Sequence, residues 1–142
     1  MKPVAIFRNV AHEGPGFLAT FLNENGIASV LFDTSDMARL PTNIADYSGL
    51  VLMGGPMSVN DELPWIDAVL TIITQAMAMD LPVLGHCLGG QLMAKACGAK
   101  VSENTQKEIG WAAVTVENNP LAKLWLADIE QFYGFHWHGE TF

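Results

Sequence analysis

The sequence predicts a three-layer α/β domain, in which a mostly parallel sheet is covered by helices on both faces. Two observations lead to this fold class. Short apolar runs alternate with longer segments of helical periodicity as far as residue 98, a pattern typical of strand–helix–strand crossovers. The first run, residues 4–7, is continuously apolar, as expected of a strand buried on both faces.

The elements follow in a regular order. Strands are expected at residues 4–7, 28–32 and 49–53, with a fourth that ends at Gly85. The first helix follows Gly16, carries apolar residues 17, 18, 21 and 22 at helical spacing, and stops at Gly26. A second helix begins near Pro64 and ends before residue 82, and a third ends at Gly98.

The pattern changes after residue 98. Residues 100–101, 111–116 and 132–138 look like strands without ten-residue helices between them, and residues 120–127 favour one short helix. This part of the chain therefore predicts an antiparallel excursion at one edge of the sheet.

Length, charge and cysteine content restrict the class of protein. At 142 residues, half of them hydrophobic, the chain fits a single domain over residues 1–142. Fifteen acidic against seven basic residues give a net charge of −8, which disfavours nucleic acid and anionic membranes as partners. Two cysteines make no disulfide framework, no secretory signal precedes the first strand, and no apolar run reaches membrane-spanning length. We therefore expect a cytoplasmic protein.

The turn at residues 85–89, here called the elbow, holds the strongest catalytic candidate. Its glycines, Gly85 and Gly89, stand two positions either side of Cys87, between a strand and a helix. A nucleophile on such a turn adopts an awkward backbone conformation that small neighbours permit. The positive end of the following helix lies close to the sulfur and favours the thiolate. We expect Cys87 to be the nucleophile and Cys97 to be inert; the alternative is that Cys87 is a buried structural cysteine.

A second glycine loop, Gly54-Gly55-Pro56, ends the third strand. Sites in parallel sheets gather at the carboxyl ends of the strands. The third and fourth strands should therefore bring this loop and Cys87 to the same rim.

Together these residues resemble the class I glutamine amidotransferase family, particularly stand-alone members similar to the amidotransferase domain of GMP synthase. Three signatures carry the resemblance: Gly54-Gly55-Pro56, the elbow extended to Gly90-Gln91, and His136-Trp137-His138-Gly139-Glu140. The family more usually has Asp where Glu140 stands. The resemblance implies a flavodoxin-like fold, glutamine as substrate, no cofactor, and a synthase partner or other acceptor of ammonia.

The resemblance also implies a role for each matching residue. The Cys87 thiolate attacks the glutamine side-chain amide, giving a thioester and ammonia, and water then releases glutamate. Backbone N–H groups of Gly55 and Leu88 hold the oxyanion. The implied substrate-binding residues are Gly54, Pro56, Gln91, His138 and Gly139. Without the motif, an ordinary exposed helix residue is as good an interpretation of Gln91 as a substrate-binding residue.

The family takes its catalytic base and orienting carboxylate from a His-Pro-Glu segment, which this sequence does not contain. We therefore expect a C-terminally incomplete domain, without its closing strands and helices, and an impaired glutaminase. Among the four histidines, we expect His12 on the surface and His86 to point away from the thiol. His136 and His138 share a strand face, but two ligands without a third are a weak zinc signal, and we predict no metal site.

Three alternatives stay open beside the amidotransferase. A hydrolase of γ-glutamyl amides or peptides would share the elbow. A non-catalytic binding relative would explain the missing base. The protease-like branch of the same fold usually has histidine after its elbow cysteine, whereas Leu88 follows Cys87 here.

Overall fold

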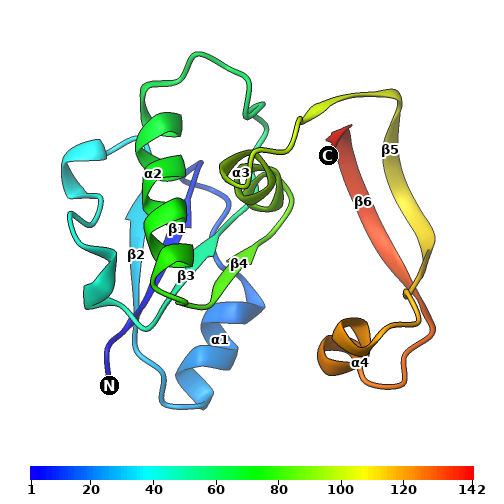
Figure 1. Ribbon diagram of the computed structural model, residues 1–142, viewed down its shortest axis with the longest axis horizontal. Coiled ribbons are helices and arrows are strands. Elements are labelled where there is room, and N and C mark those ends of the chain that lie inside the picture. The colour runs from blue at the N-terminus through cyan, green and yellow to red at the C-terminus, as the bar shows by residue number, and fades with distance from the viewer. The chain divides into compact units, whose positions relative to one another are not determined.

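The computed structural model describes residues 1–142. The chain divides into two compact units, residues 1–102 with 141–142, and residues 103–140. The first unit contains a parallel sheet with its helices, and the second contains a strand pair with one short helix (Figure 1).

The first unit is built on a four-stranded sheet in the order β2-β1-β3-β4. The strands are β1 (Val4–Arg8), β2 (Ser29–Asp33), β3 (Gly49–Leu52) and β4 (Val83–Gly85), and all neighbours run parallel. This order is that of the flavodoxin-like doubly wound sheet, and the predicted fold class is confirmed. The strands predicted at residues 4–7, 28–32 and 49–53 are all found, and no end is shifted by more than one residue.

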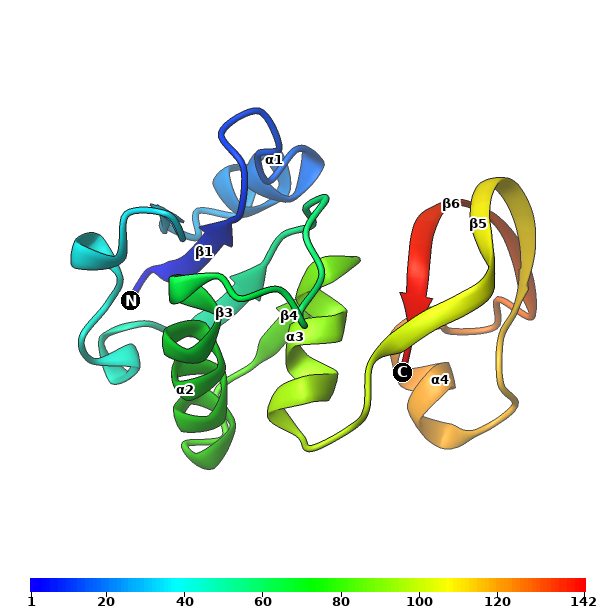
Figure 2. The same cartoon turned by 90° about the horizontal axis from the view of Figure 1, so that it is seen from above.

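Helices lie on both faces of this sheet, α1 (Phe17–Glu24) on one and α2 (Pro64–Ala78) with α3 (Leu88–Ala96) on the other (Figure 2). Pro64 occupies the first turn of α2, where its missing N–H costs nothing. Two 3₁₀ helices, η1 (Met37–Arg39) and η2 (Ile44–Asp46), connect β2 to β3.

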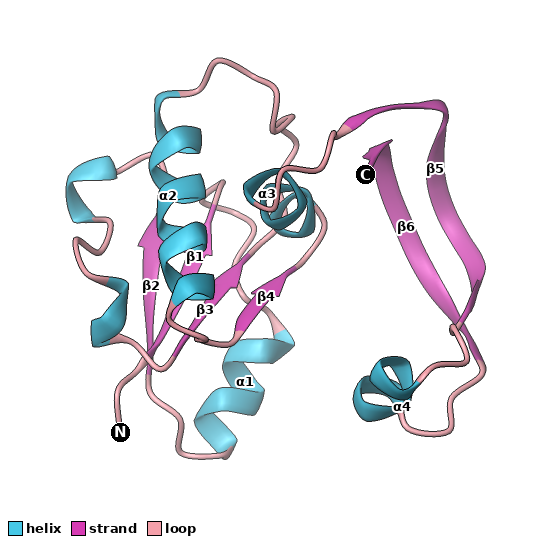
Figure 3. Ribbon diagram, viewed as in Figure 1, coloured by secondary structure: helices cyan, strands magenta, loops and turns pink.

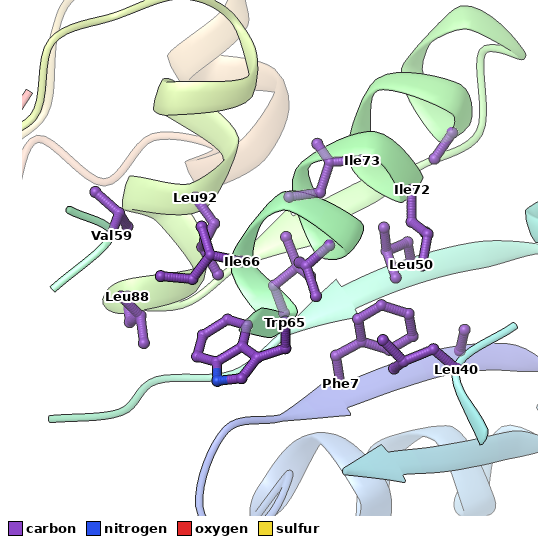
Figure 4. Close-up of a cluster of buried hydrophobic side chains, with 14 of the residues drawn as sticks. Phe7, Leu40, Leu50, Val59, Trp65, Ile66, Ile72, Ile73, Leu88 and Leu92 are labelled. Carbon is purple, nitrogen blue, oxygen red and sulfur yellow. The ribbon is translucent and has the colours of Figure 1, made fainter. Parts of the chain in front are cut away.

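The core follows from the period of two along the central strands. Ala5, Phe7, Leu50 and Leu52 pack against α2 and α3, whereas Ile6 and Val51 pack against Leu22 of α1. Figure 4 shows side chains of α2 and α3 meeting those of the sheet in the larger cluster. Burying each large apolar side chain contributes about 1.5–3 kcal/mol, so the α2–α3 face provides most of the hydrophobic stabilisation.

The second unit pairs β5 (Ser102–Thr115) with β6 (Gln131–Thr141) in a separate antiparallel sheet, with α4 (Pro120–Leu126) between them (Figure 3). Asn119 caps α4, because its side-chain oxygen accepts a hydrogen bond from Ala122 N at 2.9 Å. The antiparallel pair and the short helix are confirmed. The strand predicted at 100–101 is wrong, since β5 begins at Ser102 and continues unbroken for 14 residues.

Residues 102–110 belong to β5 but were not predicted as a strand, and the reason is physical. These residues are mostly polar and exposed, so they carry no apolar strand signal. Pairing with β6 supplies the extended backbone with hydrogen-bond partners that the local sequence does not reveal.

No helix of the chain has both the length and the apolar character needed to span a bilayer.

Candidate active site

The candidate site of the first unit lies at the carboxyl ends of its strands. Asn9 follows β1, Thr34 follows β2, Gly54 follows the end of β3 by two residues, and Cys87 follows the end of β4 by two. The strand order reverses between β1 and β3, and ligands of open α/β sheets bind at such a reversal.

The elbow holds Cys87 in a strained backbone conformation. Its φ is 54° and its ψ −114°, a region that non-glycine residues rarely occupy, and α3 begins directly after it. His86 N donates a hydrogen bond of 2.9 Å to Leu52 O, which ties the turn to β3. The side chain of Cys87 is exposed, so the alternative of a buried structural cysteine is wrong.

The two glycines of the elbow are required by close backbone packing. A Cβ on Gly85 would lie 2.6 Å from the carbonyl carbon and oxygen of Gly89. A Cβ on Gly89 would lie only 2.1 Å from Leu52 O. The first turn of α3 therefore rests directly on the ends of β3 and β4, and this close packing fixes the direction in which the elbow presents the thiol.

The Gly54–Pro56 loop lies against the elbow. A Cβ on Gly54 would be 3.5 Å from Cys87 Cβ, and one on Gly55 would be 3.1 Å from Leu88 Cδ2. The prediction that these two motifs meet at one rim is confirmed. The backbone N–H groups of Gly55 and Leu88 donate no hydrogen bond within the protein, which leaves both able to bind a ligand.

Two polar residues that the sequence analysis missed hold this loop. Asn9 is 5% exposed, and its Nδ2 donates to Met53 O at 2.8 Å and to Gly54 O at 3.1 Å. Thr34 is fully buried, and its hydroxyl donates to Asn9 Oδ1 at 3.1 Å. The signal that could have identified them is their position, since each is a polar residue directly after a strand of the parallel sheet.

Gln91, in the first turn of α3, is 7% exposed. The view of Gln91 as an ordinary exposed helix residue is therefore wrong. Pro56, by contrast, is exposed at the outer end of the glycine loop.

Two ionisable side chains border the loop beside the thiol. The position of a Gly54 Cβ is 3.6 Å from Glu13 Oε2 and 3.7 Å from His86 Nδ1. His86 is exposed next to Cys87. His12, with 81% of its side chain exposed, lies on the surface as predicted.

The remaining predicted residues, His138 and Gly139, belong to β6 of the second unit. There His138 contacts His136 and Glu108, a carboxylate of β5 that the sequence analysis did not single out. A Cβ on Gly139 would lie 3.3 Å from the Lys107 side chain, so this glycine lies close beneath a flexible chain of β5.

Comparison with known proteins links these motifs to one family. The family model of class-I glutamine amidotransferases matches residues 18–142. A glutamine amidotransferase-like protein of Salmonella typhimurium is 35% identical over 107 residues, which cover 71% of this chain and 45% of that protein. A glutamine-hydrolyzing GMP synthase of Wolbachia pipientis is 37% identical over 82 residues, 56% of this chain and 16% of the synthase.

A solved structure agrees along the whole chain. The glutamine amidotransferase of Methylobacillus flagellatus is 43% identical and aligns with a TM-score of 0.95, covering 99% of this chain and 57% of that one. This chain thus spans less than half of the Salmonella protein and just over half of the solved one.

Proposed function

Because the chain belongs to the class-I glutamine amidotransferase family, with the family match extending over residues 18–142, we propose that it cleaves the glutamine side-chain amide at Cys87. The observation that carries the proposal is the elbow itself. Cys87 is an exposed thiol in a strained conformation at the start of α3, beside the unused backbone N–H groups of Gly55 and Leu88. Structural cysteines need neither the strain nor the donors.

The first chemical step is attack of the Cys87 Sγ thiolate on the amide carbon of the substrate. The carbonyl π electrons move to oxygen, which becomes an oxyanion in a tetrahedral intermediate. The N–H groups of Gly55 and Leu88 would bind this oxyanion, and such donors are worth roughly two or three decades in rate each. Collapse of the intermediate breaks the C–N bond, ammonia leaves with an added proton, and water hydrolyses the resulting thioester to glutamate.

The glutamine substrate would be held by residues around the same rim. Gly54 and Pro56 belong to the loop beside the thiol, and the buried Gln91 amide lies on the first turn of α3. His138 and Gly139 retain the role that the family motif implies for them, shaping the glutamine or acceptor side of a site.

The proton that the departing nitrogen needs is supplied in the family by a His-Pro-Glu segment, which is absent from these 142 residues. Attack by the thiolate on an electrophile does not depend on that later proton transfer. Covalent labelling of the thiol is therefore a sharper first test of this chain than turnover.

We would treat the chain with a chloroketone analogue of glutamine and locate the adduct by mass spectrometry, beside Cys87→Ser and Cys97→Ser variants. Cys97 is the matched control, because it too is an exposed thiol but lies at the end of α3. We expect one adduct in the parent and in Cys97→Ser, none in Cys87→Ser, and protection by excess glutamine. Labelling that survives Cys87→Ser, or that glutamine does not slow, contradicts the proposal.

The oxyanion loop has its own test. A Cβ on Gly55 would lie within 3.1–3.2 Å of Asn9, Leu88 and Met57, so Gly55→Val displaces the loop. We expect the labelling rate to fall by roughly a hundredfold, the worth of one oxyanion donor. An unchanged rate in a variant with parental circular dichroism removes this loop from the site.

Substrate class is distinguished by competition. Relatives named as glutamine-hydrolyzing GMP synthases favour glutamine as the donor and a synthase as the consumer of ammonia. Glutamine should therefore protect Cys87 at lower concentration than a γ-glutamyl peptide. The reverse order would favour the γ-glutamyl hydrolase alternative.

A further inference from the structure

Three ligand atoms of the second unit converge on one point. Glu108 Oε2, His136 Nδ1 and His138 Nε2 all lie within 4.8 Å of one another. His136 and His138 are two residues apart on β6 and so share a face, while Glu108 comes from the paired strand β5. The strand pair thus supplies the third ligand that the two histidines lack in the sequence.

The distances match those between ligands of a tetrahedral metal ion. Metal bonds of about 2.0–2.1 Å to imidazole nitrogen and carboxylate oxygen set tetrahedral ligand atoms about 3.3–3.4 Å apart. The two nitrogens are 3.3 Å apart, and Glu108 Oε2 is 3.4 Å from His138 Nε2 and 3.8 Å from His136 Nδ1. Only the last separation must shorten, by a few tenths of an ångström, and Glu108 is an exposed and flexible side chain.

A proton satisfies this cluster less completely than a metal ion does. A ring nitrogen that carries a proton can donate to Glu108 but no longer accepts, so hydrogen bonds cannot use all three lone pairs at once, whereas a cation contacts all three together. Nδ1 on the opposite side of the His138 ring is buried and has no hydrogen-bond partner, so Nε2 carries all the polar contacts of that ring.

The cluster is also open to solution. The side chains of Glu108, His136 and His138 keep 57%, 27% and 32% of their surface exposed. Glu108 and His136 border a hollow of about 580 Å³ whose other lining residues are all on β5. An ion can therefore enter without rearrangement of the strand pair, and a three-residue ligand set leaves a fourth position for water.

We propose that Glu108, His136 and His138 form a binding site for a divalent cation of the zinc class, with water as the fourth ligand. The two imidazoles select Zn²⁺, Ni²⁺ or Cu²⁺ over Mg²⁺ and Ca²⁺, which prefer oxygen ligands alone.

The test is a calorimetric titration of Zn²⁺ into the 142-residue chain carrying Cys87→Ser and Cys97→Ser, so that no thiolate competes for the ion. We expect one Zn²⁺ per chain, undisturbed by excess Mg²⁺. Glu108→Gln, His136→Gln and His138→Gln should each weaken binding by about a hundredfold or more, since even residues that only orient ligands cost 10–100-fold. His12→Gln, on an exposed histidine of the first unit, is the matched control and should change nothing.

Circular dichroism checks that each variant keeps the parental fold, and Co²⁺ absorption gives a second measurement that needs no variant. Tetrahedral Co²⁺ bands without a thiolate charge-transfer band support the site in the parent chain. The proposal is overturned by absence of Zn²⁺ binding, by equal binding in folded Glu108→Gln and parent, or by an equal loss in His12→Gln. Octahedral Co²⁺ spectra would likewise refute the tetrahedral geometry.

Discussion

Two adjacent glycines at the start of α3 give a sharp test of how closely this helix packs on the sheet. Gly89 and Gly90 both lie in the first turn of α3, but a Cβ on Gly89 would lie 2.1 Å from Leu52 O. The nearest atom to a Cβ on Gly90 is Gly85 O, at an ordinary 3.7 Å. Gly89→Ala and Gly90→Ala should therefore change stability in opposite directions.

The expected changes in the free energy of unfolding follow from three effects. Overpacking against a backbone atom costs about 1–3 kcal/mol, and displacing Leu52 O weakens the hydrogen bond it accepts from His86 N, worth about 1 kcal/mol. Against these losses, alanine stabilises a helix by up to about 1 kcal/mol relative to glycine. We expect Gly89→Ala to lose about 1–3 kcal/mol, and Gly90→Ala to gain up to about 1 kcal/mol because only the propensity effect applies.

The assay is urea unfolding followed by far-ultraviolet circular dichroism. With an m value of about 2 kcal/mol/M, the midpoints of the two variants should differ by about 0.5–2 M. An unchanged m value is required, since a changed one would mean that the unfolding transition itself had altered. Equal midpoints for the two variants would refute the close approach of α3 to β3.

Three further predictions concern the support of the site and the core. Asn9→Ala should lower the free energy of unfolding by about 1–3 kcal/mol, because two loop carbonyls lose their buried hydrogen-bond donor. Urea unfolding measures this loss, and a value below about 0.5 kcal/mol would count against the supporting role of Asn9. Ile73→Ala, at a fully buried position of α2, should cost about 2–5 kcal/mol by the same assay, whereas Ile109→Ala, at 63% exposure, should stay within about 0.5 kcal/mol. Equal effects would invalidate the assigned core. The Ser35 hydroxyl, together with the Arg8 guanidinium, lowers the pKa of Asp33 in the folded protein. The Asp33 carboxylate therefore stabilises the fold above its unfolded pKa, and this stability is lost as the pH falls through the lower folded pKa. Ser35→Ala should therefore destabilise the protein at neutral pH more than in strong acid; a pH-independent difference would show that the carboxylate is not involved.

The parallel sheet could be predicted because its signals are local. The apolar run at residues 4–7 matches β1, in which Ala5, Ile6 and Phe7 are almost completely buried. The position of Cys87 between two glycines identified the elbow, and the structure explains those glycines by distances of 2.1–2.6 Å to backbone atoms.

Apolar periodicity was less reliable where an element has only one packed side. Phe17 and Phe21 follow the helical spacing of α1, yet they are 77% and 48% exposed. Only Leu22 is buried there, against Ile6 and Val51, because α1 meets the sheet along a narrow strip. The sequence shows which residues are apolar but not how wide a surface is available to cover them.

The sequence by itself determined the strand–helix alternation, the elbow around Cys87 and the family, because each is written in residues close together in the chain. Only the tertiary structure decided which distant polar groups meet. Asn9 and Thr34 support the Gly54 loop from other strands, and Glu108 joins His136 across a strand pair. Such contacts depend on strand order and register, which are set by the packing of the whole sheet and leave no periodic signal in the sequence.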